Sequence, residues 1–204
     1  MSSSARTIDP MYQEALSTLR RLLDEARAAG DREPTAMTLA TLGADGCPDA
    51  RIVLLKRVDA RGLCFFTNYT STKARDIAAH AEVALCLHWK TLRDGVQVRA
   101  RGTAVKLGAA ESDTYFATRS RPSQIGAWAS LQSQILTDRS ELESRFAEIE
   151  RRYDDQPVPR PPHWGGYVVA PVRIEFWYGE RFRLHERVCY ARGRGGWSRS
   201  LLYP

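Results

Sequence analysis

The sequence has little of what marks secreted, membrane-spanning or metal-binding proteins. Its four cysteines lie far apart with no C-x-x-C pair, and its four histidines show no metal-ligand spacing. A disulfide framework and a metal site are therefore not expected. No apolar run approaches the roughly 20 residues of a membrane span, and residues 1–8 are polar and serine-rich. We expect a cytoplasmic protein with reduced thiols, no membrane partner, a disordered tail over residues 1–8 and a single domain over residues 9–204.

Concentrated charge is also missing. Thirty Lys and Arg residues against 24 Asp and Glu give a net charge of +6, but the basic residues are scattered along the chain. Such scatter is weak evidence for a nucleic-acid surface, and an acidic small molecule fits it equally well. No RNA-binding aromatic run and no glycine motif of dinucleotide- or ATP-binding folds occurs. We expect a small-molecule ligand and no nucleic-acid partner.

Hydrophobic residues make up 43% of the chain and form short strand-like runs between helical segments. Asp9 and Pro10 are typical of a helix start, and leucines then recur at helical spacing until Gly30. The later runs include predicted strands at 37–42, 83–87, 96–105 and 167–178, without a regular alternation of strand and helix. This pattern predicts an α+β fold built on an antiparallel sheet or barrel with flanking helices.

The stretch from Arg51 to Lys73 combines a strand with cationic ends, a turn and a helix start. The apolar run 51–56 is followed by Asp59-Ala60-Arg61-Gly62 and a second run at 63–67, which predicts a hairpin. Residues 70–73 then place hydroxyls and free backbone N–H groups at a helix N-terminus beside Lys73. This arrangement fits a phosphate, and a plain hairpin followed by a capped helix is the alternative.

A second candidate group is Tyr115, Arg119 and Ser123, which are spaced by four residues. If the segment is helical they share a face, where a phenol, a guanidinium and a hydroxyl would cradle a phosphate monoester. A solvated helix face is the competing interpretation, and Pro122 argues against an unbroken helix.

A third group is Arg183, His185 and Arg187, which alternate within a strand predicted over residues 182–191 and so share one face. Three potential cations side by side repel one another unless an anion neutralises them. A basic, solvent-facing edge strand is the alternative. Gln97 lies on the polar face of an alternating strand, where it would ordinarily be solvated. Trp177 would ordinarily be a buried core residue, but its indole can also flank a flat heteroaromatic ring.

Taken in order, the motifs EPTAMTLAT, RIVLLK, FFTN, SRPSQIGAWAS, WGGY and IEFW…RLHER resemble the FMN-dependent pyridoxamine 5′-phosphate oxidases from about Glu33 to the C-terminus. The resemblance implies an antiparallel FMN-binding split β-barrel that works as a homodimer, with the flavin at the subunit interface. It further implies oxidation of pyridoxamine or pyridoxine 5′-phosphate to pyridoxal 5′-phosphate. O2 would reoxidise the flavin to give hydrogen peroxide, and the amine substrate would release ammonia.

The resemblance also assigns residues to a cofactor set and a substrate set. The implied FMN residues are Arg51, Ile52, Val53, Leu54, Leu55, Lys56, Phe66, Thr67, Thr72, Lys73, Gln97, Gln132, Ser133, Trp177 and Arg187. The implied substrate residues are Lys56, Tyr115, Arg119 and Ser123 around the 5′-phosphate, with Arg183 and His185 over the pyridine ring as the catalytic pair.

Four features depart from the family pattern. Thr72 stands where the family usually has arginine, with Arg75 one turn later, and two extra residues lie between Trp89 and Gln97. The N-terminus lacks the Arg- and Tyr-containing segment that covers the site in well-known members. Glu186 makes the last motif LHER instead of LHDR, a feature of related flavin oxidases of phenazine biosynthesis.

Three functions therefore stand at this stage. They are a vitamin B6 phosphate oxidase, a phenazine-type flavin oxidase and a non-catalytic FMN-binding protein on the same fold. Tyr115, Arg119 and Ser123 are all present, which favours the phosphorylated pyridine substrate.

Overall fold

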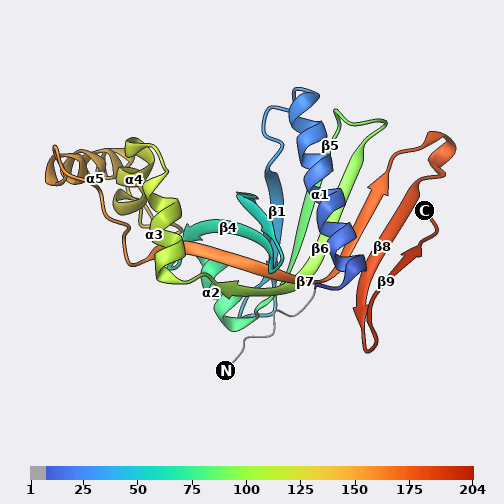
Figure 1. The fold of residues 1–204 in the computed structure, drawn as a ribbon. Coiled ribbons are helices and arrows are strands. Elements are labelled where there is room, and N and C mark those ends of the chain that lie inside the picture. The colour runs from blue at the N-terminus through green and yellow to red at the C-terminus, as the bar shows by residue number, and fades with distance from the viewer. Residues whose placement is uncertain (1–7) are drawn as a thin grey trace.

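The computed structural model describes residues 8–204, and in this part of the chain one curled antiparallel sheet is flanked by helices (Figure 1). The sheet order is β2-β1-β5-β6-β7-β4-β3, with β8 paired to β7 and β9 paired to β8. The α+β class and the split-barrel architecture are confirmed, whereas the predicted tail lies outside the described residues except for Ile8.

The strands are β1 (Ala36–Leu42), β2 (Pro48–Leu54), β3 (Arg57–Asp59), β4 (Gly62–Asn68), β5 (Glu82–Trp89), β6 (Val96–Lys106), β7 (Trp164–Tyr178), β8 (Glu186–Gly193) and β9 (Gly196–Leu201). The helices are α1 (Pro10–Ala28), α2 (Thr72–Ala79), α3 (Ala109–Ala117), α4 (Arg121–Ala129) and α5 (Arg139–Arg152), with a 3₁₀ turn at Arg181–Arg183.

Helix α1 begins and packs as its sequence predicts. The Asp9 side chain accepts a hydrogen bond from the backbone N–H of Met11 at 2.9 Å, and Pro10 occupies the first helical turn. Leu16, Leu19 and Leu22 are fully buried against the sheet. Each such leucine contributes about 1.5–3 kcal/mol through burial, so α1 closes one side of the core.

The predicted hairpin between residues 51–56 and 63–67 is wrong in its pairing. Strand β2 pairs with β1, and it is the short β3 that pairs with β4. In the two residues between β2 and β3, the Leu55 N–H donates to the Thr35 carbonyl and the Lys56 N–H donates to the Cys64 carbonyl. The chain therefore changes neighbours at Leu55, whose side chain is buried in the core. This change of neighbour brings β2 close to β4 without pairing them.

Strand β7 is the longest element of the sheet and connects two separate regions. Its first residue, Trp164, lies opposite Asn68 of β4, whereas Trp177 lies between Gln97 of β6 and Arg187 of β8. Thirteen residues of extended chain correspond to roughly 40 Å along the strand. Figure 1 shows β7 running from the helical lobe of α3, α4 and α5 to the β8–β9 hairpin. Side chains at its two ends therefore belong to different regions of one chain.

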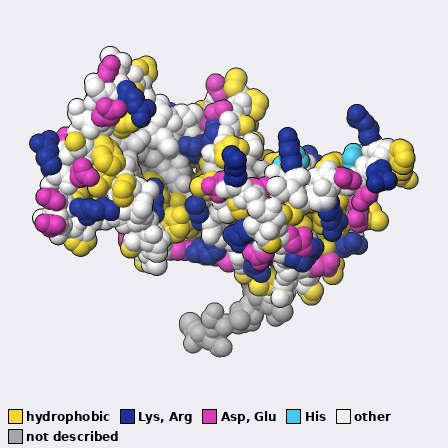
Figure 2. All heavy atoms as spheres, turned by 90° about the horizontal axis from the view of Figure 1, so that it is seen from above, with side chains coloured by type: hydrophobic (Ala, Val, Ile, Leu, Met, Phe, Trp, Pro, Cys, Tyr) yellow, Lys and Arg dark blue, Asp and Glu magenta, His cyan; other side chains and the backbone are white. Residues whose placement is uncertain are grey.

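The surface shows no separation of charge on the face seen in Figure 2. Lys and Arg side chains are spread over this face and interspersed with Asp and Glu. None of the described helices is long and apolar enough to cross a membrane.

Gly62 begins β4 and is required by the backbone there. Its φ is +136°, and a Cβ on this residue would overlap the Val169 carbonyl of β7. We expect Gly62→Ala to lower the free energy of unfolding by roughly 2–4 kcal/mol, because it adds both strain and overlap. Urea unfolding measures the loss. The matched control is Gly126→Ala in α4, where a Cβ meets nothing within 4 Å. That variant should be unchanged or more stable, and equal midpoints for the two variants would contradict the prediction.

Candidate functional site

A cleft of about 620 Å³ lies where β2, β4 and the first residue of β7 meet helices α2, α3 and α4. It brings together most of the N-terminal and middle residues predicted for the site. The predicted residues that line it are Ile52, Val53, Leu54, Lys56, Phe66, Thr67, Lys73, Tyr115, Arg119, Ser123 and Gln132.

One end of the cleft carries Lys73 near the start of α2. The Lys73 ammonium donates to Oε1 of Gln132 at 3.1 Å, and the Thr67 hydroxyl donates to the same oxygen at 3.2 Å. Burial lowers the pKa of Lys73, and the positive charge of Arg51 lowers it further. An anion bound here would relieve both effects, so this end of the cleft fits a phosphate.

Arg51 lies beside that end, anchored to its own chain. Its Nη1 donates to the Thr41 hydroxyl at 2.6 Å, and Nη2 pairs with Asp49 and, at 3.5 Å, with the buried Asp76. The Thr41 hydroxyl in turn donates to Asp76 at 2.7 Å. The guanidinium is therefore held in one place at the edge of the cleft.

Three further residues of the predicted cofactor set lie around the cleft without lining it. Thr72 begins α2, and its hydroxyl accepts from Nη2 of Arg75 at 3.2 Å. The other Arg75 terminal nitrogen donates to the Thr70 carbonyl at 2.6 Å, so this guanidinium folds back to the helix start. Leu55 is in the core, and Ser133 lies in the loop after α4 with a φ of +73°.

The other end of the cleft carries Arg119. Its guanidinium lies over the Trp164 ring at 4.6 Å from the centroid. Nη1 is buried and has no hydrogen-bond partner among residues 8–204, and burial lowers the pKa of the group. The Ser123 hydroxyl lies 2.8 Å from that of Ser120, and Tyr115 stacks on Phe66 with centroids 3.8 Å apart. A half-buried cation with a buried, unused N–H in a cleft that also contains hydroxyls is a site for an oxyanion.

The continuous helix face that would join Tyr115, Arg119 and Ser123 does not form. Tyr115 lies in α3, Arg119 lies in the turn that follows, and Ser123 lies in α4. Pro122 is in the first turn of α4, where its missing N–H costs nothing, so it starts a new helix. The bend between the two helices still brings the three side chains into the same cleft.

The remaining predicted residues gather at the far end of β7. Gln97, Trp177 and Arg187 are direct cross-strand neighbours on β6, β7 and β8. The His185 ring lies 4.5 Å from Trp177, between ring centroids, and its Nδ1 accepts from the Glu180 N–H at 3.1 Å. None of these residues lines the cleft of the same chain.

The predicted strand over residues 182–191 is wrong at its start. Phe182 and Arg183 have φ values of 57° and 62°, within the 3₁₀ turn, and β8 begins only at Glu186. A strand cannot contain two successive left-handed residues. Arg183, His185 and Arg187 therefore do not share one strand face, although His185 and Arg187 both lie beside Trp177.

Two residues with clear roles in the structure lie inside the motifs WGGY and IEFW, but the sequence predicted no role for either of them. Trp164 lines the cleft and stacks on both Arg119 and Phe66. Its position before Gly165-Gly166, where the strand backbone packs closely against Leu107 and Tyr69, was the available signal. Glu175 is 3% exposed, and a lone carboxylate in the apolar run Ile174-Glu175-Phe176 was its signal.

Comparisons with known proteins agree along almost the whole chain. A family model described as pyridoxamine 5′-phosphate oxidase matches residues 22–153, and one described as pyridoxine 5′-phosphate oxidase C-terminal dimerisation region matches residues 164–204. A pyridoxine/pyridoxamine 5′-phosphate oxidase of Myxococcus xanthus is 50% identical over 191 residues, covering 94% of this chain and 92% of the relative. One of Rubrobacter xylanophilus is 55% identical over 184 residues, covering 90% and 84%.

Two solved structures share the fold of this chain over nearly its whole length. PhzG from Burkholderia lata, in complex with tetrahydrophenazine-1-carboxylic acid, superposes with a TM-score of 0.87 at 33% identity and covers 99% of this chain and 100% of its own. A pyridoxamine 5′-phosphate oxidase-related, FMN-binding protein from Nostoc punctiforme gives a TM-score of 0.71 at 17% identity, covering 97% and 100%. The second likeness supports the split-barrel fold alone.

Proposed function

The chain belongs to the pyridoxamine 5′-phosphate oxidase family, and we propose that it is an FMN-dependent oxidase of pyridoxamine and pyridoxine 5′-phosphate. The reaction yields pyridoxal 5′-phosphate, consumes O2 and releases hydrogen peroxide. With the amine substrate it also consumes one water and releases ammonia. The observation that carries the substrate assignment is the buried, unpartnered Nη1 of Arg119 in a cleft that also contains Lys56, Tyr115 and Ser123. A phosphate monoester satisfies that N–H and matches the local positive charge.

The Lys73 end of the cleft fits the phosphate of FMN. Lys73 is a partly buried cation whose charge is disfavoured without an anion, and Gln132 and Thr67 supply polar groups beside it. Ile52 to Leu54 of β2, together with Phe66, would lie along the flavin. When bound, FMN supplies the electron acceptor for the reaction.

The substrate-phosphate end lies within the same cleft. Arg119 offers a planar fork that is already oriented by its stack on Trp164, and Lys56 adds a second positive charge. Tyr115 and Ser123 supply hydroxyls for the remaining phosphate oxygens. Two phosphate sites in one cleft are what a phosphorylated substrate stacked on FMN requires.

In this proposal the catalytic pair comes from a second copy of the chain. In one chain, Trp177, Arg183, His185 and Arg187 lie at the far end of β7 from the cleft, and all four fall within the matched dimerisation region 164–204. A symmetric homodimer formed through this region would bring the far end of one chain to the cleft of the other, twice over. The active unit is therefore a homodimer with two equivalent sites.

Two contacts orient the imidazole of His185, which we place at the reacting end of the substrate. Because its Nδ1 accepts from the Glu180 N–H, the neutral ring carries its proton on Nε2. The Trp177 ring packs against the imidazole and limits its rotation. Arg183 and His185 would orient the reacting group and hold or move a proton there.

The purified protein tests this function directly. We expect non-covalent FMN to be released on denaturation, and we expect hydrogen peroxide and pyridoxal 5′-phosphate when the protein meets pyridoxamine 5′-phosphate in air. FAD, or failure to bind FMN, would overturn the cofactor assignment.

The structural likeness to PhzG and Glu186 of the LHER motif favour a second candidate. Oxidation of a tetrahydrophenazine carboxylic acid, with no reaction of pyridoxamine 5′-phosphate, would establish that activity instead.

A further inference from the structure

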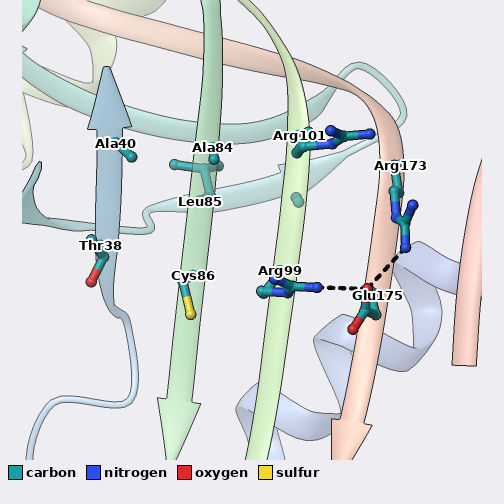
Figure 3. Close-up of a pocket in the computed structure, with 10 residues that line it drawn as sticks. Thr38, Ala40, Ala84, Leu85, Cys86, Arg99, Arg101, Arg173 and Glu175 are labelled. Atoms are coloured by element: carbon teal, nitrogen blue, oxygen red, sulfur yellow. Dashed lines mark hydrogen bonds and ion pairs between the residues drawn. The ribbon is translucent and has the colours of Figure 1, made fainter. Parts of the chain in front are cut away.

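A buried carboxylate occupies the face of the sheet where β6, β7 and β8 lie side by side. Glu175 of β7 is 3% exposed and forms ion pairs with three arginines, one from each strand. Arg99 comes from β6, Arg173 from β7 itself and Arg187 from β8. Figure 3 shows Arg99 and Arg173 approaching the carboxylate from two sides of a hollow of about 270 Å³.

All the acceptor positions of this carboxylate are in use. Oε1 accepts from Nε of Arg187 at 3.0 Å and from its Nη2 at 2.8 Å. Oε2 accepts from Arg99 at 2.8 Å and from Arg173 at 3.1 Å. A carboxylate offers about four lone-pair positions, so Glu175 is fully satisfied by charged donors. Burial alone would raise the pKa of Glu175, but the hydrogen bonds from Arg187 and Arg99 hold it below its ordinary value, so the group is ionised at neutral pH.

The strand register places this cluster next to three residues of the predicted cofactor set, on the same face of the sheet. Gln97, Trp177 and Arg187 form one cross-strand row, and Arg99 and Glu175 belong to the row two residues further along the same face. Arg187 reaches back from its own row to bind Glu175. It is therefore the connection between the buried carboxylate and the proposed FMN site.

Arg187 is held on two sides and free on a third. Glu175 takes the Nε–H and one Nη2–H, and the Tyr203 carbonyl accepts from Nη1 at 2.8 Å. Of the five N–H groups of a guanidinium, two are left without a partner within residues 8–204. Glu175 binds the side edge of the planar group, so its position determines where these two remaining donors point.

We propose that Glu175 is a positioning residue for FMN binding, which fixes the guanidinium of Arg187 so that its two free N–H groups face the flavin of the site. This inference rests on the proposed function, because it requires FMN beside Arg187. A buried ion pair that only stabilised the fold would not affect FMN binding, whereas Glu175 in this role would. Glu175 itself does not touch the cofactor; it acts through Arg187.

The test is a double-mutant cycle in FMN affinity on the full-length protein. FMN is removed, and its Kd is measured by quenching of flavin fluorescence for the parent, Glu175→Gln, Arg187→Gln and the double variant. Glutamine keeps the shape of Glu175 and removes its charge. We expect Glu175→Gln to raise the Kd at least tenfold and Arg187→Gln to raise it at least as much. The double variant should bind no more weakly than Arg187→Gln alone, because Glu175 has no other route to the flavin.

Arg173→Gln is the matched control, since it removes one arginine from the same carboxylate without touching Arg187. Its Kd should stay within twofold of the parent's. An unchanged Kd in Glu175→Gln, multiplying effects in the double variant, or an equal loss in Arg173→Gln would each overturn the proposal. If Glu175→Gln does not yield a folded dimer, Glu175→Asp replaces it, with an expected three- to tenfold loss and the same non-additivity. A parent protein that binds no FMN would defeat the proposed function itself, whereas tight FMN binding by both parent and Glu175→Gln would defeat only this inference.

Discussion

Replacement of Arg119 by alanine is expected to raise KM for pyridoxamine 5′-phosphate about tenfold to over a hundredfold, with kcat changed less than about threefold. Hydrogen bonds to a charged group contribute about 1.5–3 kcal/mol, which corresponds to that range of affinity. The substrate phosphate takes no part in the proposed reaction, so an Arg119 that holds it would bind it equally in the ground state and the transition state. Loss of such uniform binding appears in KM and not in kcat. Steady-state peroxide production over a range of substrate concentrations gives both constants.

Two controls test how Arg119 acts. One separates its charge from its packing, and the other tests whether its effect depends on the substrate phosphate. Arg119→Lys keeps a cation but loses the planar fork and the stack on Trp164, so its KM should fall between those of the parent and Arg119→Ala. Pyridoxamine without its phosphate should be a poor substrate for the parent, and Arg119→Ala should change its kinetics little. A KM for pyridoxamine 5′-phosphate that is the same in the parent and in Arg119→Ala would show that the phosphate lies elsewhere.

Local signals in the sequence predicted most of the helices well, whereas most of the residues that line the cleft were expected only from the resemblance to the oxidase family. Helix α1 follows its cap at Asp9 and its leucine spacing, because both act within one turn of the chain. Tyr115, Arg119 and Ser123 do meet in one cleft, although Pro122 divides the helix that was expected to carry them. Side-chain chemistry and approximate spacing were enough to find the group, and the bend between helices was not needed for that.

Contacts between distant segments and unusual backbone conformations could not be predicted in the same way. The run 51–56 has the composition of a strand, but its composition does not say which strand it pairs with. In the structure β2 pairs with β1, and the chain turns away at the buried Leu55. The left-handed conformations of Phe182 and Arg183 carry no glycine to announce them. A carboxylate in an apolar run marks Glu175 as unusual, but its partners could not be predicted, since two of its three arginines come from neighbouring strands and one of these is 76 residues away.

Two variants of this protein, each with low activity at a pyridoxamine 5′-phosphate concentration near the parent's KM, are expected to restore activity when they form a mixed dimer. One variant carries Lys56→Ala and Arg119→Ala in the cleft, and the other carries Arg183→Ala and His185→Ala at the far end of β7. Each homodimer has two damaged sites, and loss of the positioned catalytic pair alone should lower kcat about 100-fold or more. In the mixed dimer one site combines both sets of substitutions, whereas the other combines an intact cleft with an intact far end. It should therefore show about half the parent's turnover per dimer.

The mixed dimer is obtained by co-expressing the two chains with different affinity tags and purifying through both tags in turn. The matched control pairs the Lys56→Ala, Arg119→Ala chain with a Lys73→Ala chain, since all three residues line the same cleft. Every site in that dimer contains a damaged cleft, so no intact site forms and the low activity of the homodimers should persist. Recovery in the first pair but not in the second requires that cleft and catalytic pair come from different chains. If the first pair stays as inactive as its homodimers, the site lies within one chain, and β7 must then bend far enough in solution to bring its two ends together.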